Sequence, residues 1–292
     1  MQAELARRVD RDPVSLVHRY ENPGDQEVAG LFCASLAYGR VDLFLPVLTR
    51  LLAAFGPSPR AYCEALAQRR DFSAFAGVVY RFNVGADLAC LAWATGETLR
   101  SHGSLQALFL AEFSRTGDLR AALAGFNQHL RALAERAEIA PSLGPPRALH
   151  HLLPDASRGA ASKRHLLYLR WMARPADGVD LGAWHGLDPA QLIVPVDTHL
   201  ARLAHNLGLT QRRDLSWRTA EEITASLRLC DARDPVKYDF ALCHFGMSGL
   251  CPAQRHRARC AGCALLPSCQ AGQRSVRQPP ARRCPPPEVK ES

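Results

Sequence analysis

Four cysteines near the C-terminal end of the sequence lie within 19 residues of one another. They have the spacing C-x8-C-x2-C-x5-C, at Cys251, Cys260, Cys263 and Cys269. Thiolates this close in sequence do not readily pair as disulfides across a fold, but they can surround one zinc ion or one iron–sulfur cluster. Structural zinc usually takes two C-x2-C pairs, and only one occurs here. The spacing therefore favours a four-iron (4Fe-4S) cluster, with one structural zinc, or a set of unrelated buried thiols, as alternatives.

The composition indicates a globular protein of the reducing cytoplasm. The chain has 292 residues, 47% of them hydrophobic, so one large or two modest domains can bury a core. Residues 1–8 lack the apolar segment of a signal peptide, and no apolar stretch reaches the length of a membrane span. We therefore expect a cytoplasmic protein without a membrane partner. Its ten cysteines should be reduced there, which favours metal ligation over disulfides.

The net charge of +8 is concentrated in one part of the chain. No Asp or Glu occurs from Ala241 to Pro287, a stretch that carries seven arginines. They are Arg255, Arg257, Arg259, Arg274, Arg277, Arg282 and Arg283. Such a stretch suits a polyanion such as DNA, although a solvated surface has the same composition.

Hydrophobic periodicity predicts helices along nearly the whole chain. Apolar side chains recur at helical spacing over residues 41–55 and 119–133, whereas the only compact β-like run, Leu192 to Val196, is interrupted by Pro195. That run predicts an extended connector. The stretch from Thr219 to Glu222 has the pattern of a capping box and predicts a helix start there. The fold class expected is all-α, and the Pro- and Arg-rich end is expected to be disordered.

One segment resembles a known family of enzymes. Residues 195–203, with the sequence Pro-Val-Asp-Thr-His-Leu-Ala-Arg-Leu, open a helix, and two helices and the four-cysteine loop follow. This combination resembles the C-terminal half of the helix-hairpin-helix DNA glycosylases, such as endonuclease III and the adenine glycosylases. The likeness covers about residues 155–270, and the details are most similar to an uncharacterised bacterial branch of that superfamily.

The resemblance implies two helical lobes with duplex DNA in the cleft between them. Residues 1–26 would form an N-terminal helix, over about Gln2 to Tyr20, that packs with the cluster lobe. Residues 27–196 would form a helical barrel lobe with a degenerate hairpin, and residues 197–270 the cluster lobe around a 4Fe-4S cluster. Residues 271–292 would be a disordered basic tail. We expect a monomer that associates with the nucleoid when it is bound to DNA.

Asp197 is the residue that the resemblance assigns to catalysis. Cleavage of an N-glycosidic bond develops positive charge on the sugar, and a carboxylate held beside it can stabilise that charge and orient or deprotonate a nucleophile. The sequence also allows a purely structural role, because an Asp before Thr-His-Leu-Ala-Arg is a good helix N-cap. The two roles are compatible, since a cap fixes the carboxylate in place.

Lys163 occupies the context of the lysine with which some relatives also nick the strand. Such a lysine attacks the sugar as a Schiff-base former once its amine is neutral. The family's Gly-x-Gly hairpin is changed here to Gly159-Ala160-Ala161, which puts its anchoring of a phosphate in doubt. A solvated lysine or a phosphate contact is the alternative for Lys163, and Asp197 would then activate a water and release only the base.

Further DNA contacts are expected around these two residues. The basic loop with Arg255, Arg257 and Arg259 would touch phosphates, as would Gly159 and Ala161 of the hairpin. Arg164, Arg40 and Tyr38 are candidates too, and Tyr38 lies where the family carries a loop that probes the duplex. The expected activity is removal of a damaged or mismatched base in DNA repair, with or without lyase activity. The alternative is a nucleic-acid-binding iron–sulfur protein that does not catalyse.

Overall fold

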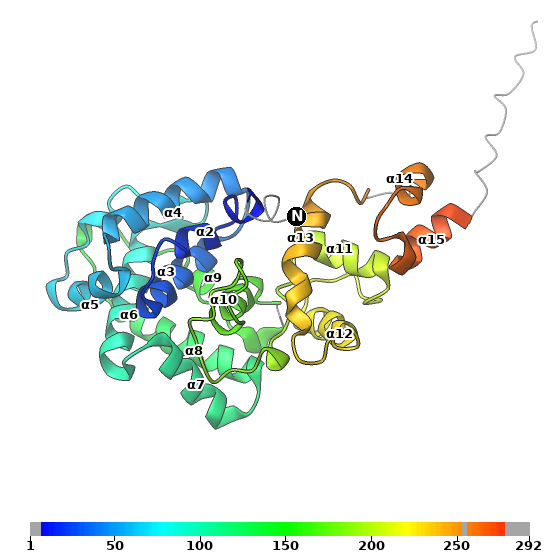
Figure 1. Cartoon of the computed structure of the whole chain (residues 1–292). Helices are drawn as coiled ribbons and strands as arrows, with labels where there is room; N and C mark the ends of the chain where they lie inside the picture. Colours follow the sequence, from blue (N-terminus) through cyan, green and yellow to red (C-terminus); the bar gives the residue numbers. More distant parts are fainter. Residues whose placement is uncertain (1–6, 160, 253–255, 278–292) are drawn as a thin grey trace, which may run out of the picture.

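The computed structural model describes residues 7–159, 161–252 and 256–277. Helices dominate these ranges, which makes the described chain all-α. The first group lies together on the left of Figure 1. It comprises α2 (Val14–Val17), α3 (Pro23–Leu36), α4 (Val41–Phe55), α5 (Pro59–Arg69), α6 (Gly85–His102), α7 (Leu105–Thr116), α8 (Leu119–Ala134), α9 (Leu149–Leu152) and α10 (Lys163–Ala173). The second group lies on the right. It comprises α11 (Thr198–Leu207), α12 (Trp217–Arg228), α13 (Asp239–Met247), α14 (Arg257–Ala261) and α15 (Gln270–Arg277).

Short 3-10 turns connect several of these helices. They are η1 (Ser73–Phe75), η2 (Pro141–Leu143), η3 (Ala156–Arg158), η4 (Pro189–Gln191), η5 (Pro235–Tyr238) and η6 (Leu266–Ser268). The helices predicted from periodicity are present as α4 and α8. Their apolar stripes are buried, and the side chain of Asp118 caps α8 by accepting from the amide of Ala121 at 2.8 Å.

One small β-hairpin interrupts the helices. Strand β1 (Val79–Tyr80) pairs antiparallel with β2 (Asn83–Val84), and only Arg81 and Phe82 form the turn between them. This hairpin is not among the elements expected from the sequence. The predicted extended connector before α11 is confirmed, since residues 192–197 are non-helical and the amide of Val194 donates to Thr224 Oγ1 at 3.1 Å.

The N-terminal segment is not the single helix that was expected over residues 2–20. In its described part a turn at residues 10–12 precedes α2, a helix of only four residues. Asp12 ends the turn by accepting from the amide of Val14 at 3.0 Å, and Pro13 follows as the N-cap. Helix α2 packs against α3, and Asp12 lies 3.7 Å from His244 of α13.

The expected disorder from residue 271 onward is wrong for its first part. Residues 270–277 form α15, which packs against α14 and α11. At the start of this helix the amide of Gly272 donates to Cys269 Sγ at 3.2 Å, and Ala271 and Gly272 are buried. Residues 278–292 lie outside the described part, so the rest of that prediction stays untested.

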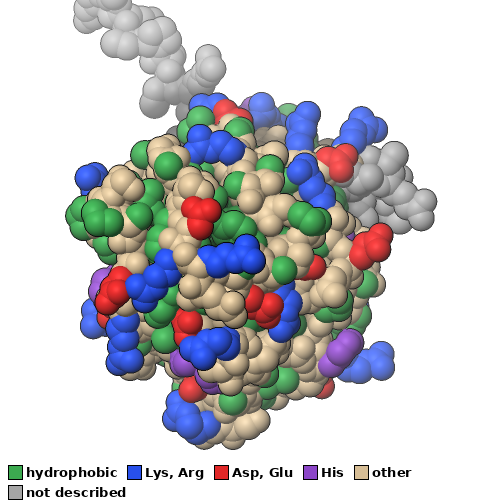
Figure 2. Space-filling view, turned by 90° about the vertical axis from the view of Figure 1, so that its left-hand side faces the viewer, with side chains coloured by type: hydrophobic (Ala, Val, Ile, Leu, Met, Phe, Trp, Pro, Cys, Tyr) green, Lys and Arg blue, Asp and Glu red, His purple; other side chains and the backbone are tan. Residues whose placement is uncertain are grey.

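On the face turned to the viewer in Figure 2, the side of α4 and α5, positive and negative side chains are interspersed, with hydrophobic side chains between them. No single helix in the described ranges is long and apolar enough to cross a membrane. The pair α4 and α5 reaches that threshold only together, and the two helices are bent by 69° relative to each other.

Candidate functional site

Lys163 and Asp197 meet where two helices begin. Lys163 is the first residue of α10, and Asp197 is the N-cap of α11. Asp197 Oδ1 accepts from the amides of His199 and Leu200 at 2.9 and 2.8 Å, and its Oδ2 accepts from Lys163 Nζ at 3.1 Å. The side chains are 33% and 17% exposed for Lys163 and Asp197. The cap therefore leaves one carboxylate oxygen free to face the lysine and the solvent.

The electrostatics keep both members of the pair charged. Burial raises the pKa of Asp197, but the charge of Lys163 and the amide of Leu200 outweigh it, so the pKa ends below its usual range. Burial likewise lowers the pKa of Lys163, and the charge of Asp197 more than offsets that effect, so the pKa ends above the usual value for lysine. At neutral pH the site holds an ammonium next to a carboxylate.

A third side chain, Cys243 of α13, completes this contact. Its thiol donates to Asp197 Oδ2 at 3.7 Å. Burial first, and then the charges of Asp239 and Asp197, raise the pKa of Cys243 well above the usual value, which keeps it a neutral thiol. Cys243 lies outside the four-cysteine loop that the sequence singles out. No local signal could identify it, because α13 reaches Asp197 only through the tertiary fold.

Two cavities open onto the pair. The inner cavity, of about 150 Å³, is lined by Lys163, Asp197, Asp239, Cys243, Phe44 and Met247, among others. The outer cavity, of about 540 Å³, is lined by Lys163 and Asp197 together with Tyr38, Gly39, Thr198 and Leu215, among others. A small ligand can therefore reach the pair on two sides.

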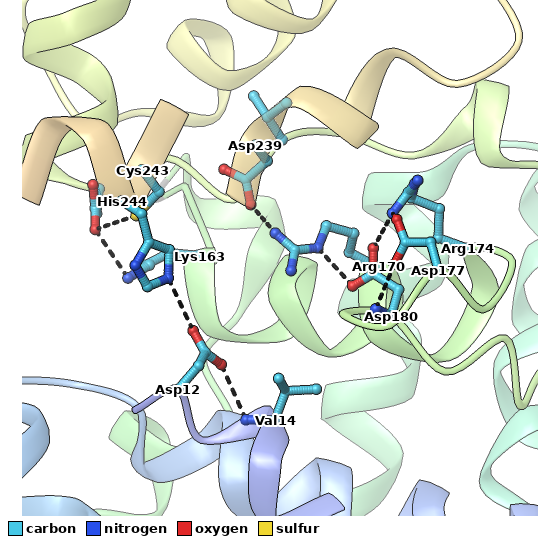
Figure 3. A network of polar contacts seen from close by, with 12 residues as sticks. Asp12, Val14, Lys163, Arg170, Arg174, Asp177, Asp180, Asp239, Cys243 and His244 are labelled. Atoms are coloured by element: carbon cyan, nitrogen blue, oxygen red, sulfur yellow. Dashed lines mark hydrogen bonds and ion pairs between the residues drawn. The ribbon is translucent and has the colours of Figure 1, made fainter. Parts of the chain in front are cut away.

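A buried ion network fixes α13 against α10 (Figure 3). Arg170, two turns after Lys163, donates to Asp180 at 3.0 Å and also to Asp239. All three side chains are at most 4% exposed. Arg174 extends the network by pairing with Asp180 and, among others, with Asp177 and Asp234. These ion pairs keep Cys243 of α13 close to Lys163 of α10. None of the residues in the network was expected from the sequence.

The network carries more negative than positive charge. Two arginines face four carboxylates, and the charged form of the buried Asp239 is strongly disfavoured. Burial raises the pKa of Asp239 to about 6, an effect that the charge of Arg170 counteracts and that of Asp197 reinforces. The carboxyl next to the inner cavity therefore titrates close to neutrality.

The degenerate hairpin lies directly before α10. Gly159 has φ 91° and its carbonyl accepts from the amide of Trp217 at 2.9 Å. Among the described residues of this turn, Ser162 is also left-handed, with φ 46°, whereas Ala161 is not and is buried. An alanine at position 161, where the resemblance implies a glycine, is therefore compatible with the backbone there. The strain is carried instead by the serine that precedes Lys163.

Three other predicted DNA contacts are engaged within the protein. Arg164 donates to the carbonyls of Ser35 and His151, and burial lowers its pKa to about 10. The hydroxyl of Tyr38 donates to the carbonyl of Tyr80 at 3.0 Å, although the residue still lines the outer cavity. Arg40 is exposed and pairs with the neighbouring Asp42 at 2.6 Å. The structure brings Tyr38 and Arg164 next to the site, whereas Arg40 lies on the exposed surface before α4.

Part of the predicted basic loop lies on α14. Arg257 and Arg259 are exposed, and neither forms an ion pair with any other described residue. The helix begins at His256, whose ring accepts from the amide of Arg259 at 3.3 Å. Arg255 lies outside the described residues. Two of the three arginines are thus available to a polyanion.

Two of the four cysteines, Cys251 and Cys269, meet at Asn206 near the end of α11. Cys251 Sγ accepts from Asn206 Nδ2 at 3.5 Å, and Cys269 Sγ donates to the carbonyl of the same Asn206 at 3.4 Å. Burial raises the pKa of Cys251, and the charges of Cys269 and Cys263 raise it further. The amide of Cys263 donates to the carbonyl of Cys260 at 3.1 Å. All four are free and partly exposed.

Four cysteine thiolates are the ligand set of a structural zinc ion or of an iron–sulfur cluster. Amide and side-chain N–H groups directed at the sulfurs are the usual outer contacts of such sites. Within the described ranges, which omit residues 253–255 between the first two cysteines, no group of three or more His, Cys, Asp or Glu side chains is spaced to hold a metal ion.

Together, these features define an all-α protein in which a helix-capping aspartate, a lysine and a thiol surround one cavity. The chain belongs to the family described as "Protein of unknown function (DUF2400)", whose profile matches residues 12–248. The match includes Lys163, Asp197, Asp239 and Cys243, and it ends three residues before Cys251. No curated protein and no solved structure matches the chain.

Proposed function

We propose that this protein is a DNA N-glycosylase that removes a damaged or mismatched base during DNA repair. The observation that carries the proposal is the contact of 3.1 Å between Lys163 Nζ and Asp197 Oδ2 at the opening of two cavities. A carboxylate that is fixed by two backbone amides and kept ionised is suited to an oxocarbenium-like transition state.

In the proposed reaction, water attacks C1′ of the nucleotide. The water oxygen bonds to C1′, the bond from C1′ to the base nitrogen breaks, and the base leaves with that electron pair. The base takes up a proton from the solvent, and Asp197 later releases to the solvent the proton that it accepts from the water. Asp197 stabilises the positive sugar and accepts the proton of the water. Oδ2 has this role, because it is held only by the side chains of Lys163 and Cys243, whereas Oδ1 is occupied by the helix cap.

Lys163 acts here as an ammonium rather than as a nucleophile. A Schiff base requires a neutral amine, and the raised pKa of Lys163 disfavours that form at neutral pH. The ammonium keeps Asp197 ionised and can hold a phosphate of the substrate. We therefore propose base release as the main activity and strand nicking as at most a minor one.

The cysteines of the C-terminal part belong to the same proposal. Cys251, Cys260, Cys263 and Cys269 would hold a 4Fe-4S cluster, with one structural zinc as the alternative. When bound, the group would stabilise the fold of this segment and supply no reacting atom. Arg257 and Arg259 on α14 would contact phosphates of duplex DNA. Helices α3 to α10 and α11 to α15 would then be the two lobes on either side of the DNA, in a monomeric protein.

The alternative is a nucleic-acid-binding iron–sulfur protein that does not catalyse. Two features favour it: the raised pKa of Lys163, which disfavours a nucleophilic amine, and Ala161 in place of the hairpin glycine that the resemblance implies. It predicts binding to duplex DNA with a strong dependence on salt, and no base release.

Base release from a panel of duplexes tests the proposal. Each duplex would carry one uracil, hypoxanthine, 8-oxoguanine, thymine glycol or mismatched adenine, and the free base would be measured by mass spectrometry. For a duplex that the wild type processes, Asp197→Asn should reduce release by about 10²- to 10⁴-fold and leave duplex binding nearly unchanged.

Asp188→Asn provides a matched control. Asp188 is also an N-cap, since it accepts from the amide of Ala190 at 2.9 Å, but it is exposed and lines neither cavity. This variant should release base at the wild-type rate. Equal release by Asp197→Asn and the wild type would overturn the assignment of Asp197, and binding to every duplex without any release would favour the alternative.

A further inference from the structure

Helix α13 carries two sulfur atoms next to Lys163 and Asp197. Cys243 and Met247 are four residues apart on α13, so their side chains share one face of the helix, and their sulfurs lie 3.9 Å apart. Both residues line the inner cavity. Met247 is 46% exposed, so it does not fill the core. A thioether held beside a thiol at the edge of a cavity is a pair of potential metal ligands.

The carboxylate of Asp197 supplies a third potential ligand. Its Oδ2 lies 3.7 Å from Cys243 Sγ. Metal ions lie about 2.3 Å from a thiolate sulfur and about 2.1 Å from a carboxylate oxygen. At trigonal angles, two sulfurs on one ion are then about 4.0 Å apart, and a sulfur and an oxygen about 3.8 Å. Both measured separations around Cys243 match a single three-coordinate ion.

The charges around Cys243 are negative on balance. The carboxylates of Asp239 and Asp197 act on its sulfur more strongly than the ammonium of Lys163, which opposes them. A cation at this sulfur neutralises the thiolate and is attracted by both carboxylates. The surroundings of Cys243 therefore favour a thiolate that carries a bound cation over a bare thiolate.

The ligand types select a soft ion. Calcium and magnesium require oxygen ligands, and zinc requires a tetrahedral set of nitrogen, thiolate or carboxylate ligands. Among the residues that the structure describes, no three His, Cys, Asp or Glu side chains are spaced to hold a metal ion, so zinc lacks a full set here. A thioether paired with a thiolate suits Cu(I).

A separate cavity gives an ion access to the two sulfurs. This cavity, of about 810 Å³, is lined by Asp10, Asp42, His244 and Met247, among others. His244 and Met247 also line the inner cavity, whereas neither sulfur-bearing residue lines the outer one. An ion can therefore reach Met247 from the side of the N-terminal segment, without passing through the outer cavity.

We propose that Cys243 and Met247 bind a Cu(I) ion, with Asp197 Oδ2 as its third ligand, and that the bound ion blocks base release. The thiol of Cys243 loses its proton to the solvent as the copper–sulfur bond forms, and copper stays monovalent. The ion then occupies the inner cavity and engages the oxygen of Asp197 that meets Lys163. The metal site follows from the geometry of the three ligands, whereas the block rests on the proposed function.

The side-chain methyl group of Met247 tests the site directly. The full-length protein, labelled with ¹³C-methyl methionine, would be titrated with Cu(I) without air while its NMR spectrum is recorded. Because the four-cysteine loop also takes up soft ions, the titration would continue until that loop is saturated. We expect the Met247 signal, assigned by its loss in Met247→Leu, to shift. The signal of the buried Met172 should stay in place, and Zn(II) should shift neither.

Cys243→Ser should abolish the shift of Met247. Its affinity for Cu(I) at this site should fall by more than the roughly 10- to 100-fold that the loss of an outer contact costs. Cys230→Ser and Cys263→Ser are controls, since the first removes an exposed cysteine elsewhere and the second a cysteine of the loop, and both should keep the shift. The Met172 signal reports whether each variant is folded.

Three results would overturn the site. They are no shift of Met247 in the wild type, an unchanged shift in Cys243→Ser, and an equal shift with Zn(II). A shift that is lost in Cys263→Ser would assign the ion to the loop and would overturn the site as well.

Base release then tests the block separately. For a duplex that the wild type processes, release should fall in proportion to the shifted fraction of the Met247 signal. Met247→Leu should release base at the same rate with and without Cu(I). Unchanged release by wild type with the site filled would overturn the block and leave the metal site intact. A Met247 shift that depends on Cys243, with no base released by metal-free protein, would support the site and count against the glycosylase.

Discussion

Asp197 divides its carboxylate between two tasks, with Oδ1 on the amides of His199 and Leu200 and Oδ2 on Lys163 Nζ at 3.1 Å. The helix cap sets the position of the oxygen that meets the lysine. Asp197, which caps α11, therefore also determines the position of the Lys163 ammonium at the start of α10. Stability and chemistry can be separated here, because each oxygen has its own partners.

Substitutions of Asp197 should separate the cap from the ion pair. Asparagine caps helices about as well as aspartate, whereas alanine does not cap. We expect Asp197→Ala to lower the free energy of unfolding by about 1 kcal/mol more than Asp197→Asn does. Urea denaturation measures both variants. Equal losses would mean that the ion pair with Lys163, and not the cap, accounts for the contribution of Asp197 to stability.

The raised pKa of Lys163 predicts a distinct pH dependence for any covalent intermediate. The neutral fraction of an amine rises about tenfold per pH unit below its pKa. Trapping of a Schiff base with cyanoborohydride on an abasic duplex should therefore be weak at pH 6 and increase steadily toward alkaline pH. Lys163→Arg keeps the positive charge next to Asp197 but cannot be trapped, so it is the control. Strong trapping that does not change between pH 6 and 8 would show that DNA lowers the pKa of Lys163.

Some of the fold could be read from the sequence because the signals are local. The apolar stripes of α4 and α8 repeat every three to four residues, and Asp197 precedes its helix as caps usually do. Helix α12 begins earlier than the capping-box pattern predicts. Thr219 and Glu222 fit a capping box, but the helix begins at Trp217 with Ser216 as its N-cap, and Thr219 is a buried residue of the first turn.

The rest of the site depends on tertiary contacts that leave no pattern in the sequence. Cys243 and Asp239 reach Lys163 only because Arg170 anchors α13 against α10, through residues 69 positions apart. The strands of the hairpin at residues 79–84 are too short to show a period-two pattern. Its turn has Arg81 at a left-handed position, where a glycine would have indicated a turn in the sequence.

The raised pKa of Asp239 predicts how stability changes with pH. A carboxyl whose folded pKa lies above its unfolded value favours the folded state most below pH 4, and this contribution is lost as pH rises through about 6. Asp239→Asn cannot ionise. Relative to the wild type, its free energy of unfolding should therefore rise between pH 4 and 8, by on the order of 3 kcal/mol for a shift of this size. Chemical denaturation at several pH values measures the difference.

Asp214→Asn is a control of opposite sign for this titration. Hydrogen bonds from Ser216 and Thr219 lower the pKa of the exposed Asp214, so its ionised form favours the folded state. This variant should lose stability relative to the wild type at neutral pH and recover at low pH. The same pH trend in both variants would contradict the raised pKa of Asp239.

Gly39 should be intolerant of a side chain because of the hairpin it faces. It has φ 81°, and a Cβ would lie 2.5 Å from a guanidinium nitrogen of Arg81 and 2.7 Å from the hydroxyl of Tyr80. Gly39→Ala should lower the free energy of unfolding by more than the roughly 1–2 kcal/mol of a left-handed alanine. Gly117→Ala has the same kind of backbone strain, with nothing within 4 Å of the added atom, and measures that part alone. Equal losses in urea denaturation would mean that Arg81 and Tyr80 move aside freely.

The arrangement of four cysteines near Asn206 predicts a bound cluster in protein purified without air. We expect a brown protein with about four irons and four sulfides per chain, the content of a cubane held by four thiolates. Cys263→Ser should lose most of the iron and lower the thermal unfolding midpoint, because the cluster would hold α14 and α15 next to the end of α11. Cys230→Ser is the matched control, since Cys230 is exposed and lies outside the four-cysteine loop, and it should keep its iron. A colourless protein with one zinc, lost on Cys263→Ser, would identify the structural zinc instead. Full stability of Cys263→Ser without any metal in the wild type would leave the four thiols as independent side chains.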